Sequence, residues 1–214
     1  MIQTNPSFSN AAIGPHETVL QDIHHQAKNI AIFQRNLAPL QEMLKGLANE
    51  TIECRASGTK NAVLSSLQEY FDAHLPDYPA LFKDISNALG LFEQTTKASS
   101  FRLLLATVKT NMCRKFHTDV NTIRMLCTYI GQGTLWLPDE ALDQVALRSI
   151  RKNHDIDPDK KHIQQVQTGD LVLLKGALYP DGNPIMHRSP SIEEYGEQRL
   201  LLRIDSNEFL NHFL

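Results

Sequence analysis

The chain has 214 residues and a mass of 24.2 kDa, enough to bury a substantial core. It is 42% hydrophobic and 21% charged, with a formal net charge of -3 and a sequence pI near 6.3. Because acidic residues outnumber basic ones, bulk nucleic-acid binding is not expected. No apolar run is long enough to cross a bilayer and the first residues do not resemble a secretory signal, so we expect a cytoplasmic protein without a membrane partner.

The three cysteines, Cys54, Cys113 and Cys127, are odd in number and show no CxxC spacing. This pattern indicates neither a disulfide framework nor a zinc knuckle made of thiolates. We therefore expect reduced thiols, with one or two of them buried as small apolar side chains. The sequence leaves the oligomeric state open.

The front half of the chain is expected to be helical. Apolar residues recur at helical spacing over residues 16–48, where Pro39 would divide the stretch into two helices. Two further helices are predicted at 61–74 and 80–97, with the turn PDYP between them. Residues 1–98 are thus predicted to form an almost entirely α-helical part.

After residue 98 the pattern changes to short runs of branched and aromatic residues separated by turn signals, which is typical of strands. A polar interruption at 138–168 is predicted to contain a helix and then an exposed loop, and residues 206–214 to form a short closing helix. Short strands around one insertion favour a β-barrel or sandwich over 99–214, packed with the helical part in one compact α+β unit. The strands are predicted at 101–108, 113–119, 123–130, 134–137, 170–175, 184–187 and 198–205.

The segment CRKFHTDV contains the first candidate metal-binding residues. His117 and Asp119 lie two residues apart in a predicted strand, so both side chains leave the same face and can bind one ion. A third ligand has to come from elsewhere, and His187 follows a strand-like segment after the turn YPDGNP. Two histidines and one carboxylate leave half of an octahedron open, a set that favours iron(II), while zinc or manganese would also fit these ligand types.

The run EQRLLLRID places Arg199 and Arg203 on one face of a predicted strand and aliphatic residues on the other. Because a guanidinium matches a carboxylate in shape and charge, either arginine is a candidate to bind an anionic cosubstrate beside the metal. The alternative is that both arginines are solvated or paired with Glu193, Glu194 or Glu197.

Other side chains of the predicted strands are candidates for the pocket around these residues. Arg124, Thr128 and Tyr129 could assist in binding the anion. Cys127 could line the site or offer a thiolate to zinc, although a buried and inert thiol is the simpler interpretation. Trp136, like Tyr129, is expected in the wall or core of the barrel, with direct substrate contact as the alternative.

The order HTD, distal histidine and then arginine resembles the signature of iron(II)/2-oxoglutarate-dependent oxygenases. More closely, the strings CRKFHTDVNTIRMLCTYIGQGTLWLPD, GDLVLLKG, HRSP and RLLLRID resemble an uncharacterised bacterial family known as a domain of unknown function. This closer resemblance covers residues 99–205 well. The oxygenase resemblance implies a double-stranded β-helix, a jelly-roll or cupin-like barrel, with His117, Asp119 and His187 as the iron ligands.

The same resemblance implies that 2-oxoglutarate chelates the metal and that Arg199, or alternatively Arg203, binds its distal carboxylate. The interval of twelve residues from His187 to Arg199 is longer than the commonest interval in those enzymes. The implied function is an oxygenase acting on an unknown small-molecule or peptide substrate. That substrate is expected beneath the helical part or the 138–168 insertion.

Two other functions are compatible with the sequence. The same three ligands, with a water or a cysteine completing the coordination of the metal, would suit a metal-binding accessory protein for zinc or iron homeostasis without oxygenase activity. A jelly-roll module without metal would instead recognise a small anion through its arginines, and His117 and His187 would then point apart. Metal binding and the response to 2-oxoglutarate separate the three functions.

Overall fold

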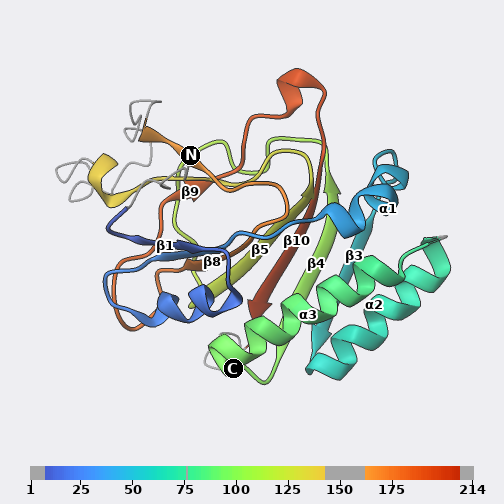
Figure 1. Ribbon diagram of the computed structural model, residues 1–214, viewed down its shortest axis with the longest axis horizontal. Helices are drawn as coiled ribbons and strands as arrows, with labels where there is room; N and C mark the ends of the chain where they lie inside the picture. The colour runs from blue at the N-terminus through green and yellow to red at the C-terminus, as the bar shows by residue number, and fades with distance from the viewer. Residues whose placement is uncertain (1–7, 76, 143–161, 208–214) are drawn as a thin grey trace.

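The computed structural model describes residues 8–75, 77–142 and 162–207, and its centre is a seven-stranded sheet with the order β1-β2-β8-β5-β10-β4-β3 (Figure 1). A second sheet has three strands in the order β7-β6-β9. The large sheet consists of β1 (Ala11–Gly14), β2 (Ile30–Phe33), β3 (Glu53–Gly58), β4 (Phe101–Val108), β5 (Ile123–Ile130), β8 (Leu171–Lys175) and β10 (Arg199–Ser206). The small sheet consists of β6 (Leu135–Trp136), β7 (Gln164–Gln165) and β9 (His187–Arg188).

The large sheet carries apolar side chains on both of its faces. In β10, Leu200, Leu202 and Ile204 belong to the larger buried core. Leu201 of the same strand belongs to a second apolar cluster on the opposite face. This alternation follows from the two-residue period of a strand. We call the face with the larger core the outer face and the opposite one the inner face.

Helices cover the outer face. α2 (Lys60–His74) and α3 (Pro79–Thr96) run side by side along the β10-β4-β3 end of the sheet (Figure 1), and their apolar residues join the larger core. α2 begins after Thr59, whose hydroxyl accepts a hydrogen bond from the Ala62 amide and caps the helix. The shorter helical elements are α1 (Gln41–Gly46) and the 3-10 helices η1 (Glu17–His24), η2 (Ala38–Leu40), η3 (Asp139–Ala141) and η5 (Glu193–Tyr195).

The small sheet packs on the inner face. Trp136 of β6 and Val166, which follows β7, are buried in one cluster with Leu126, Val172 and Leu201 of the large sheet. Two sheets packed face to face are typical of a jelly roll. The barrel predicted from the sequence is not closed, because no strand of the small sheet pairs with the large sheet in the described ranges.

Of the two helices predicted over residues 16–48, the structure contains as α-helix only a short part of the second, α1. That stretch contains the two 3-10 helices η1 and η2, the strand β2 and the short helix α1. Strand β2 has the sequence IAIF, and an apolar run of this length fits a strand or part of a helix equally well. Because β1, β2 and β3 all join the large sheet, the first 98 residues are not almost entirely helical. The boundary between two parts at residue 98 stays a prediction.

Elements with stronger patterns occur where the sequence predicts them, namely α2, α3, β4, β5, β8 and β10. The strand predicted at 113–119 is wrong, since only His117 forms an isolated β-bridge there. The strand predicted at 184–187 is displaced to β9. The helix predicted in the first part of the 138–168 insertion lies mainly outside the described residues, which include only η3 from it. The closing helix predicted at 206–214 also lies mainly outside them.

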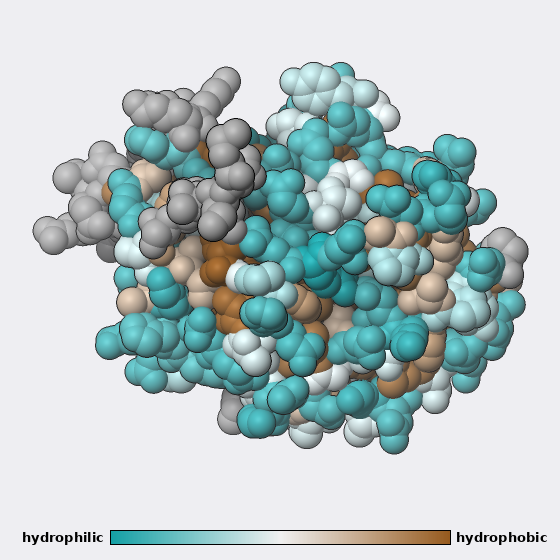
Figure 2. All heavy atoms as spheres, viewed as in Figure 1, coloured by the Kyte–Doolittle hydropathy of each residue, from teal (hydrophilic) through white to brown (hydrophobic). Residues whose placement is uncertain are grey.

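Most polar side chains lie on the surface. One face of the molecule is largely hydrophilic, with apolar side chains gathered near its middle (Figure 2). Among the helices that the structure describes, none combines the length and the apolar character needed to cross a membrane. The apolar residues are used chiefly to cover the two faces of the large sheet.

Candidate metal centre

His117, Asp119 and His187 come together beside β9, at the edge of the small sheet. His117 and His187 form a β-bridge in which each backbone N–H donates to the carbonyl of the other at 3.0 Å. Their ring centroids lie 4.6 Å apart. The Asp119 carboxylate lies 3.4 Å from Nε2 of His187 and 3.8 Å from Nε2 of His117. The two histidines therefore point toward a common centre and not apart.

The spacing of these atoms fits a single metal ion. One ligand atom from each of the three residues can be chosen so that all lie within 4.8 Å of one another. Two ligands that meet at right angles with bonds of about 2.1 Å lie about 3 Å apart, so only a small inward movement is needed. Two imidazoles and one carboxylate on one side of an ion leave its opposite side open to further ligands.

Backbone hydrogen bonds hold both imidazoles in the form that binds a metal. Nδ1 of His117 lies 3.1 Å from the Lys115 carbonyl, and Nδ1 of His187 lies 3.3 Å from the Ile185 carbonyl. Since a carbonyl oxygen only accepts hydrogen bonds, Nδ1 of a neutral ring carries the proton and Nε2 keeps its lone pair. Both lone pairs then face the Asp119 carboxylate, an arrangement that is stabilised by a cation placed between them.

The electrostatic surroundings favour the metal-binding forms of the ligands. Burial, together with the charge of His187, lowers the pKa of His117, which keeps this imidazole neutral. Burial alone would raise the pKa of Asp119, but its close contacts with His187 and Arg124 outweigh burial and lower the pKa to about 2. Asp119 is therefore ionised at neutral pH, as a metal ligand must be.

Arg124 connects the Asp119 carboxylate to the large sheet. Its Nη1 lies 2.6 Å from Asp119 Oδ2, while its Nε and Nη2 donate to the Asp205 carboxylate at 2.7 and 3.3 Å. Asn121 also donates to Asp205, at 3.1 Å. Arg124, predicted to assist in binding an anion, thus connects the candidate metal ligand Asp119 to Asp205 and fixes its orientation. Sequence reasoning missed Asp205 and Asn121, although Asp205 shares a strand face with Arg203.

Replacing Arg124 with glutamine is expected to weaken metal binding by about 10–100-fold, the usual effect of removing an outer partner of a ligand. Asp119 would lose the contact that fixes its orientation. Titration of the protein with Mn(II) measures the change. Arg114→Gln is the matched control, because Arg114 is exposed and pairs with Glu193. Equal affinities of the two variants would show that Arg124 does not position Asp119.

Arg199 is a buried arginine without a carboxylate partner in the described ranges. It is 1% exposed, and its Nη2 donates to the hydroxyls of Thr128 and Thr134 at 2.9 and 3.4 Å. Its Nε is buried with no hydrogen-bond partner among the residues described. Burial lowers the pKa of Arg199 to about 10, so the side chain is still charged at neutral pH. A buried charge of this kind is strongly stabilised by an anion.

A short chain of contacts links Arg199 to the small sheet that carries His187. Thr134, which contacts Arg199, precedes Trp136 by two residues, and Trp136 pairs with His187. Gly131 packs closely against the start of β10, since a Cβ there would lie 2.2 Å from the Gln198 carbonyl oxygen and 3.2 Å from Cγ of Arg199. Sequence reasoning missed Thr134.

Arg203 has a different environment. Its Nε lies 3.2 Å from the Asp205 carboxylate, and its side chain is 34% exposed. The glutamates considered as partners for the two arginines bond elsewhere: Glu193 with Arg114, Glu194 with Asn111 and Glu197 with Gln132. The structure therefore separates a buried, unpaired Arg199 from an accessible, paired Arg203.

Tyr129 and Cys127 face away from the metal ligands. The Tyr129 hydroxyl donates to Asp84 at 2.6 Å, and Cys127 contacts Arg35, both on the outer face. Neither residue reaches the site, because Thr128 points inward and neighbouring residues of a strand point in opposite directions. Both are buried in the larger core, as the simpler interpretation of each predicted, and the alternative role of Tyr129 in binding the anion is wrong. Burial raises the pKa of Cys127 to about 12, so this thiol stays protonated and offers no thiolate.

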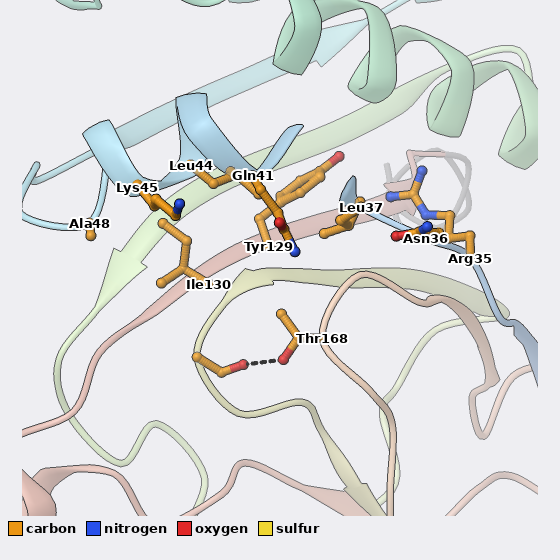
Figure 3. Close-up of a pocket in the computed structure, with 11 residues that line it drawn as sticks. Arg35, Asn36, Leu37, Gln41, Leu44, Lys45, Ala48, Tyr129, Ile130 and Thr168 are labelled. Atoms are coloured by element: carbon orange, nitrogen blue, oxygen red, sulfur yellow. Dashed lines mark hydrogen bonds between the residues drawn. The ribbon is translucent and has the colours of Figure 1, made fainter. Parts of the chain in front are cut away.

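A cleft of about 580 Å³ opens on the outer face beside Tyr129 (Figure 3). Its walls include Leu37 and Leu44, and the Thr168 hydroxyl at its edge donates to the Gly131 carbonyl at 2.6 Å. None of the three candidate metal ligands lines this cleft. Tyr129 thus belongs to a surface separate from the metal centre.

Replacing Tyr129 with phenylalanine is expected to leave metal and 2-oxoglutarate binding unchanged. The free energy of unfolding is expected to fall by roughly 1–3 kcal/mol, because Asp84 would lose one hydrogen-bond donor in a partly buried site. Asp84 keeps its two contacts with Arg35, at 2.6 and 2.9 Å, so the fold should persist. Urea unfolding measures the stability. A loss of 2-oxoglutarate binding would place Tyr129 in the site after all.

Trp136 lies in the wall between the two sheets, as the sequence predicts. It is 1% exposed, and its ring meets that of Phe8 edge-on at 5.2 Å between centroids. Its Nε1 is buried without a hydrogen-bond partner among the residues described. Since Trp136 pairs with His187, this unsatisfied donor belongs to the same side of the molecule as the metal ligands.

Comparison with solved structures shows the class of fold. The chain is similar to the dioxygenase for auxin oxidation 1 from Arabidopsis thaliana in its 2-oxoglutarate binary complex, at 10% identity over 92% of this chain and 91% of that chain, with a TM-score of 0.52. It is also similar to a prolyl-4-hydroxylase from Pseudomonas putida, at 12% identity over 88% and 96% of the two chains, with a TM-score of 0.43. The fold of this chain is thus similar to that of the auxin dioxygenase.

The chain belongs to the family described as protein of unknown function (DUF1826), whose family model matches residues 14–205. This membership confirms the resemblance to a domain of unknown function that the sequence motifs indicate. No curated protein sequence is detectably similar to it.

Proposed function

We propose that this protein is a non-haem iron(II)/2-oxoglutarate-dependent oxygenase. One observation carries the proposal: a buried arginine with no carboxylate partner among the described residues lies on the same side of the large sheet as a compact set of two histidines and an aspartate. A metal set alone would suit many functions, and a buried arginine alone would suit any anion. Their combination on a related jelly roll is what a metal-chelating dicarboxylate cosubstrate requires.

The residues present fit both groups. His117, Asp119 and His187 would hold iron(II), for which zinc or manganese could substitute, since all three ions accept imidazole nitrogen and carboxylate oxygen. Arg199 would bind the distal carboxylate of 2-oxoglutarate, with Thr128 and Thr134 as neighbouring hydroxyls. When bound, the metal would activate dioxygen and 2-oxoglutarate would supply two of the electrons that reduce it, so that the overall reaction would convert 2-oxoglutarate, dioxygen and a C–H bond to succinate, carbon dioxide and an alcohol.

The protein's own contribution is to orient the cosubstrate and to hold the site dry. Arg199 and its apolar surroundings would fix one end of the dicarboxylate in a buried position. The neutral imidazoles and the ionised Asp119 would fix the metal at the other end. Helices α2 and α3 pack on the outer face. They therefore do not cover the site, in contrast to the prediction that the substrate lies beneath the helical part. The substrate, a small molecule or a peptide, would approach from the inner side.

The test is the formation of succinate from 2-oxoglutarate by anaerobically purified protein that is given Fe(II) and then exposed to air. We expect slow succinate formation even without the substrate, and none in His187→Ala. Circular dichroism of that variant checks that its fold persists. A wild-type protein that binds Fe(II) but neither binds nor consumes 2-oxoglutarate would overturn the proposal.

The same measurements test the alternative function, a metal-binding accessory protein for zinc or iron homeostasis. Tight zinc binding with no change on addition of 2-oxoglutarate would favour that function. The unpaired guanidinium of Arg199 argues against it, because metal storage does not require a buried cation beside the ligands. We place either activity in the cytosol, where the three free cysteines would stay reduced.

A further inference from the structure

A row of charged side chains crosses the inner face beside the metal centre. Arg102 of β4 and Arg124 of β5 both lie opposite Asp205 of β10 in the register of the sheet. Arg203 precedes Asp205 by two residues and so lies on the same face. Arg124 and Arg203 contact Asp205, Arg102 lies opposite it in the register, and Arg124 also contacts the candidate metal ligand Asp119.

The carboxylate of Asp205 is already satisfied. Its Oδ1 accepts from Arg124 at 2.7 Å and from Asn121 at 3.1 Å. Its Oδ2 accepts from Arg124 at 3.3 Å and forms an ion pair with Arg203 at 3.2 Å. A carboxylate has about four acceptor positions, so Asp205 leaves none for Arg102, although Arg102 is its register partner.

Within the described part of the chain, Arg102 and Arg203 keep hydrogen-bonding capacity that no residue there uses. Nε of Arg102 is buried and has no hydrogen-bond partner in the ranges that the structure describes. Arg203 contacts Asp205 through Nε alone, and its side chain is 34% exposed. As diagonal neighbours on adjacent strands, their Cα atoms lie about 7–8 Å apart, within reach of long side chains. Two guanidinium groups so placed can converge on one oxyanion.

The local charge favours an anion as well. Three guanidinium groups share two carboxylates, Asp119 and Asp205, and both histidine ligands bind a metal in their neutral form. A divalent ion would add two further positive charges, and Arg199 would take up only the distal end of 2-oxoglutarate. An excess of positive charge therefore remains at the accessible side of the site, where Arg203 reaches solvent.

We propose that Arg102 and Arg203 bind an anionic group of the substrate, a carboxylate or a phosphate, beside the metal. The inference rests on the proposed function and names the substrate class of that same site: an acidic molecule whose reacting carbon lies near its anionic group. Arg199 suits the cosubstrate because it is buried, whereas Arg203 is accessible to a molecule that enters from outside.

The experiment uses Mn(II)-loaded protein with saturating 2-oxoglutarate, and inorganic phosphate and acetate as the two probes. Mn(II) is paramagnetic, so a probe bound beside it shows broadened phosphorus or methyl proton resonances. We expect saturable broadening of one probe, which also tells phosphate from carboxylate. In Arg102→Gln/Arg203→Gln the dissociation constant for that probe is expected to rise at least about tenfold, the effect of one lost charge-assisted hydrogen bond.

The matched control is Arg55→Gln, which removes an exposed arginine of the neighbouring strand β3 that pairs with Glu53. This variant is expected to bind the probe like the wild type. A second variant, Arg102→Lys/Arg203→Lys, keeps the charges but loses the planar fork, and it is expected to bind the probe more weakly than the wild type. Absence of saturable broadening in the wild type, or equal binding in the double glutamine variant, would overturn the inference.

The binding of 2-oxoglutarate separates this inference from the proposed function. If Arg203→Gln abolishes binding of 2-oxoglutarate, then Arg203 is a cosubstrate anchor and the inference is overturned while the oxygenase function stands. If the wild type binds no 2-oxoglutarate, the oxygenase function fails. Calorimetric titration of the metal-free protein with phosphate and with acetate then still measures whether Arg102 and Arg203 bind an oxyanion.

Discussion

The Asp119→Ala variant is expected to lose tight binding of divalent metal ions. Asp119 supplies the carboxylate of the three-residue set, and it is held ionised by its surroundings. Loss of an outer partner of a ligand weakens metal binding by about 10–100-fold, so loss of the ligand itself is expected to exceed about 100-fold. Calorimetric titration with Mn(II), or with Fe(II) under anaerobic conditions, measures the affinity.

Asp181→Ala is the control for that variant, because Asp181 is an exposed aspartate outside the ligand set. It is expected to bind metal like the wild type. The fold of Asp119→Ala is expected to persist, since Arg124 keeps its two hydrogen bonds to Asp205. Circular dichroism checks this point. If Asp119→Ala folds and binds metal with wild-type affinity, then Asp119 is not a ligand.

Replacing Arg199 with glutamine is expected to weaken 2-oxoglutarate binding by about 100-fold or more, because two charge-assisted hydrogen bonds of about 1.5–3 kcal/mol each would be lost. Metal affinity without the cosubstrate should not change, since Arg199 contacts Thr128 and Thr134 and none of the three candidate ligands. Titration of Mn(II)-loaded protein with 2-oxoglutarate measures the effect. Arg203→Gln is the matched control and is expected to keep the wild-type affinity.

A structural role for Arg199 would have a different signature. The Arg199→Met variant replaces a buried, unpaired guanidinium with an apolar side chain of similar length, so the free energy of unfolding is expected to stay equal or to increase. Thermal unfolding in the absence of 2-oxoglutarate measures it. A marked loss of stability would show that Arg199 supports the fold through its threonine contacts and would remove it from the cosubstrate site.

The parts of the fold that could be predicted are those with long, consistent patterns. Strands β4, β5 and β10 each have eight residues with apolar side chains on both faces, and helices α2 and α3 bury a regular apolar stripe. Strands β1 and β2 have only four residues each, and their place in the sheet depends on pairing with each other and with β8. A run of four residues does not indicate which distant strand it pairs with.

The grouping of the three candidate metal ligands could be predicted, because residue type and spacing point to it. The bridge from Asp119 through Arg124 to Asp205 could not, since it depends on the register between β5 and β10. The prediction that both Thr128 and Tyr129 assist in binding the anion contradicts the two-residue period of a strand. Consecutive residues point to opposite faces, so they cannot both face the same site, and Tyr129 is the one that faces away.

In strand β10, residues that support the fold and residues that face the site are close neighbours in the sequence. Its outer side chains Leu200, Leu202 and Ile204 hold the larger core, while Arg199 and Arg203 on its inner side carry charge toward the site. In a library that varies every position of this strand, polar substitutions at the outer positions would therefore deplete folded protein. Substitutions at 199 and 203 would leave the amount of protein intact and change only what it binds, whereas substitutions of Leu201 between them, which belongs to the second apolar cluster, would again deplete folded protein.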